Sequence, residues 1–283
     1  MRLNKMRLTP SRQNAVLTTG ANSGIGLVTA LELARRGWRS IGSVRSDEKA
    51  AIVAKAAAEA GLEVETVVMD VTDSDRCEQV MSGLRLRGLI NCAGYNSSGA
   101  ISDVDDDEAR RSLETMAVAP MRLARLALPG IVAAGGGRIV NVSSVGGCIT
   151  MPLSGWYVAA KHALEAASDA LRMEVARRNV QVVVIEPGGF RTGIFEEGVH
   201  AEGPDSITSR TTEYADSYLQ IKKIMSPRGD PARVARLIAN VLEVRRPRAR
   251  YVIGADARLL IALQQLPTPA VDGLYRRLYH LHS

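Results

Sequence analysis

The chain has 283 residues, of which 46% are hydrophobic and 23% are charged, as in a soluble globular protein. A chain of this length buries a core large enough to need no disulfides or structural metals. The formal net charge is +6, but the arginines are spread over predicted helix faces and no basic run is interleaved with aromatic residues. We therefore expect solvated charges, with a basic pocket for an anionic cofactor as a second contribution, and no nucleic-acid partner.

Cysteine usage and the N-terminus bear on the location of the protein. Cys77, Cys92 and Cys148 are widely spaced and include no C-x-x-C pair, so we expect reduced thiols and a cytoplasmic protein. Residues 1–12 are basic and polar, which predicts a flexible arm without a secretory segment. Because no apolar run approaches the ~20 residues that a membrane span needs, we expect no integral membrane segment.

Apolar runs and helix-forming segments alternate along the chain. The runs predict strands at 14–20, 38–46, 62–73, 86–94, 137–144, 180–189 and 249–254. Between them, apolar residues at helical spacing predict helices at 25–37, 47–61, 74–83, 105–134, 154–179 and 230–245. The helix at 105–134 contains Pro120, where we expect a possible break.

The strands are rich in Val and Ile rather than strictly alternating, as in parallel sheets that are covered on both faces. We therefore expect an α/β, single-domain Rossmann fold over residues 13–255, a doubly wound parallel sheet with helices on both faces. Residues 256–283 lie outside this pattern but have amphipathic spacing. We expect this C-terminal extension to pack on its own domain or on a neighbouring subunit, with a membrane-surface role as the alternative.

A glycine-rich loop, TGANSGIG at 19–26, joins the first strand to the first helix. Its glycines have the spacing G-x-x-x-G-x-G, which differs from the commoner dinucleotide pattern. Such a loop lets the backbone approach a pyrophosphate, and the helix N-terminus supplies N–H donors. Glycines also end ordinary strands, but this position favours cofactor binding. The loop residues expected to contact the cofactor are Gly20, Asn22, Ser23, Gly24, Ile25 and Gly26.

The end of the second strand indicates which cofactor is bound. Val44 stands where an acid would accept the ribose 2′-hydroxyl of NAD, and Arg45 follows it. A guanidinium grips a phosphate bidentately, so we expect NADP(H), although a surface arginine would look the same. Asp47 and Glu48 are interpreted as the N-cap and the first-turn acid of the next helix.

Tyr157 and Lys161 lie four residues apart and so share one helix face. An ammonium close to a phenol favours the phenolate and lowers its pKa, which would let the pair exchange a proton with a carbonyl or an alcohol. Ser144 ends the fifth strand, at the sheet edge where ligands bind in open α/β folds. On its own, a Tyr and Lys pair at this spacing is more often an ordinary surface pair.

Several motifs together carry a family resemblance. The segments TGANSGIG, NCAG at 91–94, VSS at 142–144, YVAAK at 157–161 and EPGGFRT at 186–192 occur in the order and spacing of the short-chain dehydrogenase/reductase family. The resemblance covers residues from about 13 to 255. In its motifs the chain is most similar to hydroxysteroid and retinol dehydrogenases and their bacterial relatives.

The resemblance implies a role for each matching residue. Tyr157 would be the general acid/base, Lys161 would hold the nicotinamide ribose and lower the tyrosine pKa, and Ser144 would orient the substrate carbonyl. Further cofactor contacts are implied for Asp70 and Val71 at the adenine, Asn91, Ala93 and Gly94 on the adenosine side, and Pro187, Gly188 and Thr192 at the carboxamide. The family also implies a small carbonyl or alcohol substrate and a homodimer or homotetramer.

One position departs from the family pattern. The family usually has an asparagine in the long helix before the fifth strand, where a kink holds a water that links the lysine to solvent. Met116 stands at that position, and no asparagine lies between residues 97 and 140. A thioether is only a weak acceptor, so the side chain cannot hold that water and the relay is in question.

Three hypotheses about function follow. The leading one is an NADP(H)-dependent oxidoreductase that interconverts a ketone or aldehyde and an alcohol, with residues 190–228 as the substrate lid. Met116 keeps open a non-redox enzyme on the same scaffold, such as a cyclase or dehydratase-like catalyst of bacterial secondary metabolism. A cofactor-sensing binding protein is the third, and the presence of Ser144, Tyr157 and Lys161 together argues against it.

Overall fold

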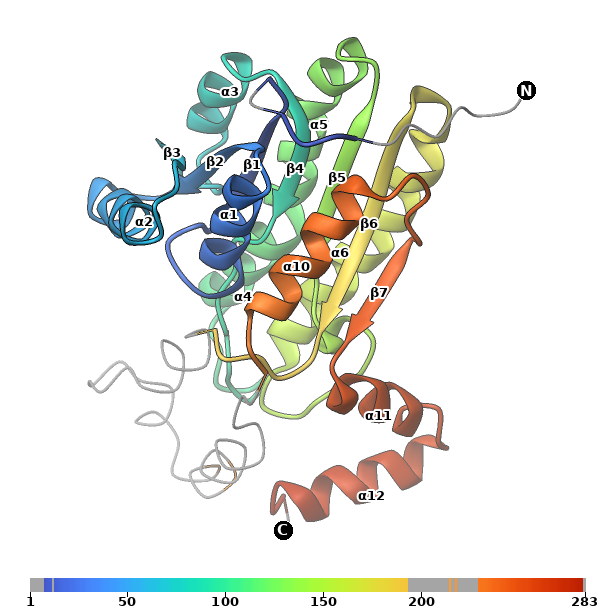
Figure 1. Ribbon diagram of the computed structural model, residues 1–283. Coiled ribbons are helices and arrows are strands. Elements are labelled where there is room, and N and C mark those ends of the chain that lie inside the picture. The colour runs from blue at the N-terminus through green and yellow to red at the C-terminus, as the bar shows by residue number, and fades with distance from the viewer. Residues whose placement is uncertain (1–7, 12, 193–213, 215–216, 218–228, 282–283) are drawn as a thin grey trace.

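A seven-stranded parallel sheet in the order β3-β2-β1-β4-β5-β6-β7 forms the centre of the molecule (Figure 1). The structure, a computed structural model, describes residues 8–11, 13–192, 214, 217 and 229–281. The strands are β1 (Ala15–Thr19), β2 (Arg39–Val44), β3 (Glu65–Val68), β4 (Leu86–Asn91), β5 (Gly137–Val142), β6 (Val180–Pro187) and β7 (Arg250–Ile253). Strand order reverses beside β1, so the crevice between the ends of β1 and β4 is where such folds bind ligands.

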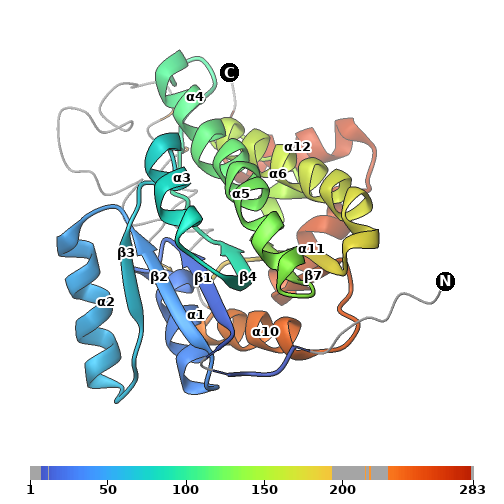
Figure 2. The same cartoon turned by 90° about the horizontal axis from the view of Figure 1, so that it is seen from above.

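Helices cover both faces of the sheet (Figure 2). One layer contains α1 (Gly24–Arg35), α2 (Asp47–Glu59) and α10 (Ala232–Glu243). The opposite layer contains α3 (Ser74–Ser82), α4 (Asp106–Leu113), α5 (Ala119–Ala133) and α6 (Gly155–Glu174). Three short turns of helix are η1 (Glu114–Val118), η2 (Val145–Gly147) and η3 (Ala176–Arg178). This architecture confirms the predicted doubly wound α/β fold.

Local sequence signals fix where several helices begin. The side chains of Ser46, Asp73 and Asp105 each accept a backbone N–H in the first turn of α2, α3 and α4. Asp47 was expected to be the N-cap of α2, but Ser46 holds that place. Asp47 and Glu48 both lie in the first turn, where their charge favours the positive end of the helix.

Two hydrophobic clusters fill the space between the sheet and its helix layers. On the α5 side, Leu17 and Ile139 of the strands pack against Leu123. On the α10 side, Val16 packs with Ile238, and Leu8 belongs to the same cluster with only 3% of its surface exposed. The flexible arm predicted over residues 1–12 is therefore wrong at Leu8, whose apolar side chain is held in the core.

The stretch from Asp106 to Ala133 is helical throughout, so Pro120 does not break it as expected. A π turn, η1, absorbs the proline instead, because Pro120 has no N–H to donate to the carbonyl of Met116. Among the described residues this is the one helix whose length and composition would suit a membrane span. Its buried residues, such as Leu123 and Ile131, pack in the core against the sheet, as in a soluble α/β domain.

The C-terminal extension forms two helices, α11 (Ala255–Leu263) and α12 (Thr268–Leu278), that lie beyond the carboxyl end of β7 (Figure 1). It packs on its own domain. Ala257 and Tyr275 join Val145 and Val158 in one apolar cluster, next to the segment that carries Tyr157. The extension therefore supports one wall of the site described next.

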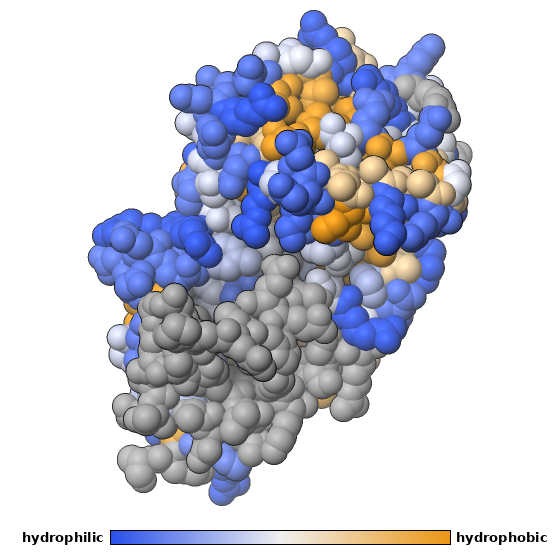
Figure 3. Space-filling model, turned by 90° about the vertical axis from the view of Figure 1, so that its left-hand side faces the viewer, coloured by the Kyte–Doolittle hydropathy of each residue, from blue (hydrophilic) through white to orange (hydrophobic). Residues whose placement is uncertain are grey.

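On the side of the molecule that α2 borders, hydrophilic and hydrophobic residues are interspersed (Figure 3).

Candidate active site

A cavity of about 620 Å³ runs along the carboxyl ends of the strands, within the size range of small-molecule sites. It brings together all but one of the predicted cofactor and catalytic residues. Those that line it are Gly20, Asn22, Ser23, Gly24, Ile25, Gly26, Arg45, Asp70, Val71, Ala93, Gly94, Ser144, Tyr157, Lys161, Pro187, Gly188 and Thr192. The predicted lid at 190–228 falls mostly on residues 193–213, 215–216 and 218–228, which lie outside the described residues.

The glycine loop leaves no room for side chains on the cavity floor. Gly20 and Gly24 have φ values of 65° and 50°, which L side chains rarely adopt. A Cβ at Gly26 would lie 2.1 Å from the carbonyl oxygen of Gly20, and one at Gly20 would lie 2.9 Å from Cα of Ala93. The bare backbone thus forms a cradle at the N-terminus of α1, which fits a pyrophosphate.

Asn91 is the predicted cofactor residue that the cavity does not include. It lies below the floor and is 3% exposed, and its amide nitrogen donates to Asn141 Oδ1 at 2.8 Å and to the Pro120 carbonyl at 3.2 Å. These bonds hold its side chain away from the cavity, and the expected contact of Asn91 with the adenosine side stays a prediction. Thr19 links the strand ends above it by accepting the N–H groups of Cys92 and Ala93.

Two basic residues lie at the β2 end of the cavity. Arg45 is exposed and follows β2 directly, and Lys49 lines the cavity from the first turn of α2. Sequence reasoning missed Lys49, although its place four residues after Arg45 was a signal. Asp70 also lines this end, where its Oδ1 accepts both the N–H and the hydroxyl of Thr72. The two cations make this end attractive to an anionic group.

Another part of the cavity wall is built from residues that no motif indicated. The guanidinium of Arg111 lies 4.9 Å from the ring centroid of Tyr95, and its Nε donates to the Tyr95 hydroxyl at 3.3 Å. Burial raises the pKa of Tyr95 to about 12, so this phenol stays neutral. Thr115 of η1 completes the wall. The helix positions of Arg111 and Thr115 gave no sequence signal, since only the π turn and the packing of α4 direct them to the cavity.

The three predicted catalytic residues meet at the other end. Lys161 is buried, and its Nζ donates to the Val142 carbonyl at 3.0 Å and lies 5.8 Å from the ring centroid of Tyr157. Ser144 caps η2 by accepting the Gly146 N–H at 3.1 Å. The end of β5 and the first turns of α6 thereby hold a hydroxyl, a phenol and an amine on one wall.

The pKa values at this end differ from the expectation. We expected the Lys161 ammonium to lower the pKa of Tyr157. Instead burial raises the pKa of Tyr157, an effect that a hydrogen bond with Ser144 partly offsets. Burial also lowers the pKa of Lys161 to about 8. Both groups are buried, and burial disfavours the charged form of each.

Met116 lies in the middle of η1 and is 1% exposed. A Cβ placed on Gly94 would be 3.4 Å from both Cγ and Sδ of Met116 and 3.9 Å from Nζ of Lys161. The thioether therefore fills the space beside Gly94, close to the lysine. The π turn forms without the asparagine, because the N–H of Ala119 bonds to the carbonyl of Glu114 and Pro120 has no N–H to donate.

Residues 14–203 match the family model described as short chain dehydrogenase. The chain belongs to the short-chain dehydrogenase family. It is 33% identical to a probable short-chain type dehydrogenase/reductase, VdlC, of Helicobacter pylori, over 91% of this chain and 95% of that protein. It is 30% identical to mouse retinol dehydrogenase 5, over 94% and 88% of the two chains. The resemblance to this branch of the family is thus confirmed.

Solved structures of family members have the same fold. The structure of an actinorhodin polyketide ketoreductase variant with NADPH superposes with a TM-score of 0.73 at 27% identity, covering 87% of this chain and 97% of the other. The family membership places this chain among the short-chain oxidoreductases, and this solved relative contains NADPH.

Proposed function

We propose that the protein is an NADP(H)-dependent oxidoreductase that interconverts a ketone or aldehyde and an alcohol, with Tyr157 as the general acid/base. One observation carries the proposal. A single cavity joins the glycine cradle and Arg45 at one end to Ser144, Tyr157 and Lys161 at the other. A dinucleotide bound along it would have its phosphates at the α1 N-terminus and its reactive ring beside Tyr157.

The preference for NADP(H) rests on the β2 end of the cavity. Arg45 stands where a ribose 2′-phosphate would lie, Lys49 is one helical turn further on, and Val44 offers no carboxylate to a 2′-hydroxyl. Because Arg45 is exposed, keeping its side chain charged costs little free energy, and its guanidinium is free to bind a phosphate through two N–H groups. The related ketoreductase was crystallised with NADPH, which agrees with this preference.

In the proposed reaction, the bound nicotinamide supplies or takes the hydride. The residues of this chain handle the proton and the substrate oxygen. Because its pKa is raised, Tyr157 is a neutral phenol at neutral pH and donates its proton to the carbonyl oxygen of a ketone. Ser144 orients the same oxygen by a hydrogen bond. Lys161, whose pKa is about 8, changes its charge just above neutral pH and returns a proton to Tyr157.

A non-redox catalyst on the same fold is the second candidate, and Met116 is the observation that favours it. With Met116 packed beside Gly94 and Lys161, the usual water-holding asparagine is missing from the proton path. The relatives named above carry dehydrogenase or reductase names, which favours the redox reading. The remaining expectations are a cytoplasmic homodimer or homotetramer and a small-molecule substrate.

The test is a screen of ketones and secondary alcohols with NADPH and NADP⁺, read by the absorbance of the reduced nicotinamide. The proposal predicts turnover with at least one carbonyl compound and a preference for NADPH over NADH. Tight binding of NADPH without turnover of any substrate would favour the non-redox candidate. Absence of NADPH binding would contradict the proposal as a whole.

A further inference from the structure

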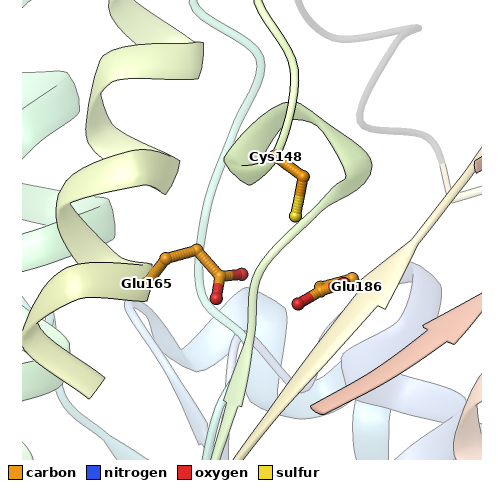
Figure 4. Close-up of side chains that lie close together, drawn as sticks. All are labelled: Cys148, Glu165 and Glu186. Carbon is orange, nitrogen blue, oxygen red and sulfur yellow. The ribbon is translucent and has the colours of Figure 1, made fainter. Parts of the chain in front are cut away.

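A group of buried acids lies beside the catalytic end of the cavity. Glu165 of α6, Glu186 near the end of β6 and Cys148 just after η2 direct their side chains toward one common space (Figure 4). One sulfur or oxygen atom from each lies within 4.8 Å of the others. The two carboxylates are almost fully removed from solvent, with 7% of Glu165 and 2% of Glu186 exposed.

Arg250 of β7 is the cation that faces this group. Its Nε lies 3.1 Å from Glu165 Oε2 and 3.3 Å from Glu186 Oε1. Its two terminal nitrogens bind Asp169 at 3.0 and 2.7 Å, and Asp169 also pairs with Arg172. Since Asp169 takes up much of the charge of Arg250, the two glutamates, if both ionised, would leave negative charge uncompensated in the interior.

Buried charge of one sign is costly unless a proton or a cation neutralises it. Oxygen Oε1 of Glu165 and of Glu186 accepts no hydrogen bond of good geometry from the described residues. Burial raises the pKa of both carboxyls, and the charge of Glu165 raises the pKa of Glu186 further. The Cys148 thiol, with a pKa of about 12, stays protonated and adds no third negative charge.

A metal ion is the less suitable neutraliser. The guanidinium of Arg250 already stands beside an oxygen of each glutamate, where it would repel a divalent cation. The thiol of Cys148 would also have to lose a proton that burial holds firmly. A single proton retained by the two carboxyls balances the charge with no further ligand, as in other close carboxyl pairs.

The acid pair is placed to act on the catalytic residues. Glu165 follows Lys161 by one turn of α6, and its charge acts on the lysine by raising the lysine pKa against the effect of burial. A Cβ on Gly147 of η2 would lie 2.6 Å from Ser143 Oγ and 3.1 Å from Glu165 Oε1. The Ser143 hydroxyl and the Glu165 carboxyl therefore both lie next to Gly147. Ser143 in turn lines the cavity, which connects the pair to the site.

We propose that Glu165 and Glu186 share one proton at neutral pH and that this pair supplies protons to Lys161, in place of the route that Met116 removes. The inference rests on the proposed function. In a reduction, Tyr157 gives its proton to the carbonyl oxygen and recovers one from Lys161. Lys161 then takes the shared proton from Glu165, which follows it by one turn of α6, and the pair regains a proton from solvent.

The kinetic test is Glu186→Gln, which keeps the volume and removes the shared proton. We expect kcat for ketone reduction to fall about tenfold at pH 8 and less at pH 6, where solvent supplies protons more readily, while KM for NADPH is unchanged. Glu174→Gln removes an exposed carboxylate from the same helix, α6, that carries Glu165, and it should change kcat less than about twofold.

The double variant Glu186→Gln with Met116→Asn decides between proton supply and structure. If the pair supplies protons, an asparagine at position 116 should restore most of kcat at pH 8. A kcat that falls equally at every pH and is not restored would overturn the proposal, because it would show a structural role alone.

A measurement without turnover separates this inference from the proposed function. The infrared carbonyl stretch of a protonated carboxylic acid should be present at pH 7 in the wild-type protein and absent from Glu186→Gln. Its absence from the wild-type protein, or one equivalent of bound divalent metal in the purified protein, would overturn the shared proton even if the enzyme reduces ketones. Its presence in a protein without reductase activity would leave the proton pair intact and assign the failure to the proposed function.

Discussion

The two ends of the cavity are built by different means. At the β1 and β2 end, bare backbone at Gly20, Gly24 and Gly26 shapes the floor, and the charged side chain of Arg45 is exposed to solvent. At the β5 to β7 end, buried charged side chains line the cavity or lie beside it, with Lys161, Glu165 and Glu186 all less than a tenth exposed.

The two ends should therefore respond differently to mutation and to pH. A backbone cradle fails through steric overlap and is insensitive to pH. Buried charges are coupled through a medium of low polarity, so that changing one of them alters the pKa values of the others. Cofactor binding and proton transfer should therefore be separable by mutation, and only proton transfer should depend steeply on pH.

The largest expected effect separates the two ends directly. Tyr157→Phe removes the proton donor without changing the cradle, so kcat should fall by about 10²- to 10⁴-fold. The dissociation constant of NADPH, measured by fluorescence titration, should remain within about twofold of the wild-type value. Activity retained by this variant would refute the role of Tyr157.

The cradle is tested by Gly26→Ala. The new Cβ would lie 2.1 Å from the Gly20 carbonyl oxygen, so the loop must open. We expect NADPH affinity to fall about 100-fold and the free energy of unfolding to fall by about 2–4 kcal/mol. Gly273→Ala is the matched control, because nothing lies within 4 Å of its added Cβ. If both variants bound NADPH equally well, the backbone cradle would not be the phosphate site.

A smaller effect is expected from Arg45→Ala, which leaves the cradle unchanged. The dissociation constant of NADPH should rise about tenfold and that of NADH should stay the same, since only the 2′-phosphate loses a partner. Arg85→Ala removes an exposed arginine far from the cavity residues and serves as the control for net charge. An equal loss of affinity for both nucleotides would contradict the assignment of Arg45.

The smallest effect concerns stability and its dependence on pH. Burial lowers the pKa of Lys161 to about 8 in the folded chain, from 10.5, so the charged form opposes folding. This cost is fully present below pH 8 and disappears as pH rises to 10.5. Lys161→Met should therefore raise the free energy of unfolding by about 1–2 kcal/mol at pH 7, allowing for the lost bond to Val142. Urea unfolding at pH 7 and pH 10 should show this gain shrinking, and a gain that is equal at both would contradict a charge effect.

The sequence predicts the glycine-loop end of the cavity better than it predicts the end with buried side chains. The glycine loop is a local pattern between one strand and one helix, and Gly20, Gly24 and Gly26 lie where expected because the backbone alone specifies them. The side chain of Asn91 does not line the cavity, because its bonds to Asn141 and Pro120 depend on how two distant segments pack.

The buried acids show the limit of sequence reasoning more clearly. Glu165 looks like an ordinary helix-surface acid in sequence, nothing in the sequence pairs it with Glu186, and Arg250 is 85 positions from Glu165. Only the pairing of β6 with β7 and the packing of α6 bring them together. The raised pKa of Tyr157 was missed for the same reason, since burial has no signature in a Tyr and Lys pair four residues apart.

The most direct test of the whole account is the transfer of label from NADPH deuterated at the transferring position of its nicotinamide to a ketone found in the substrate screen. The account predicts an alcohol that carries one deuterium on its carbinol carbon with the wild-type protein, formed at least about 100-fold more slowly by Tyr157→Phe under the same NADPH saturation. Saturable NADPH binding with no deuterium in the product of any ketone offered would contradict it.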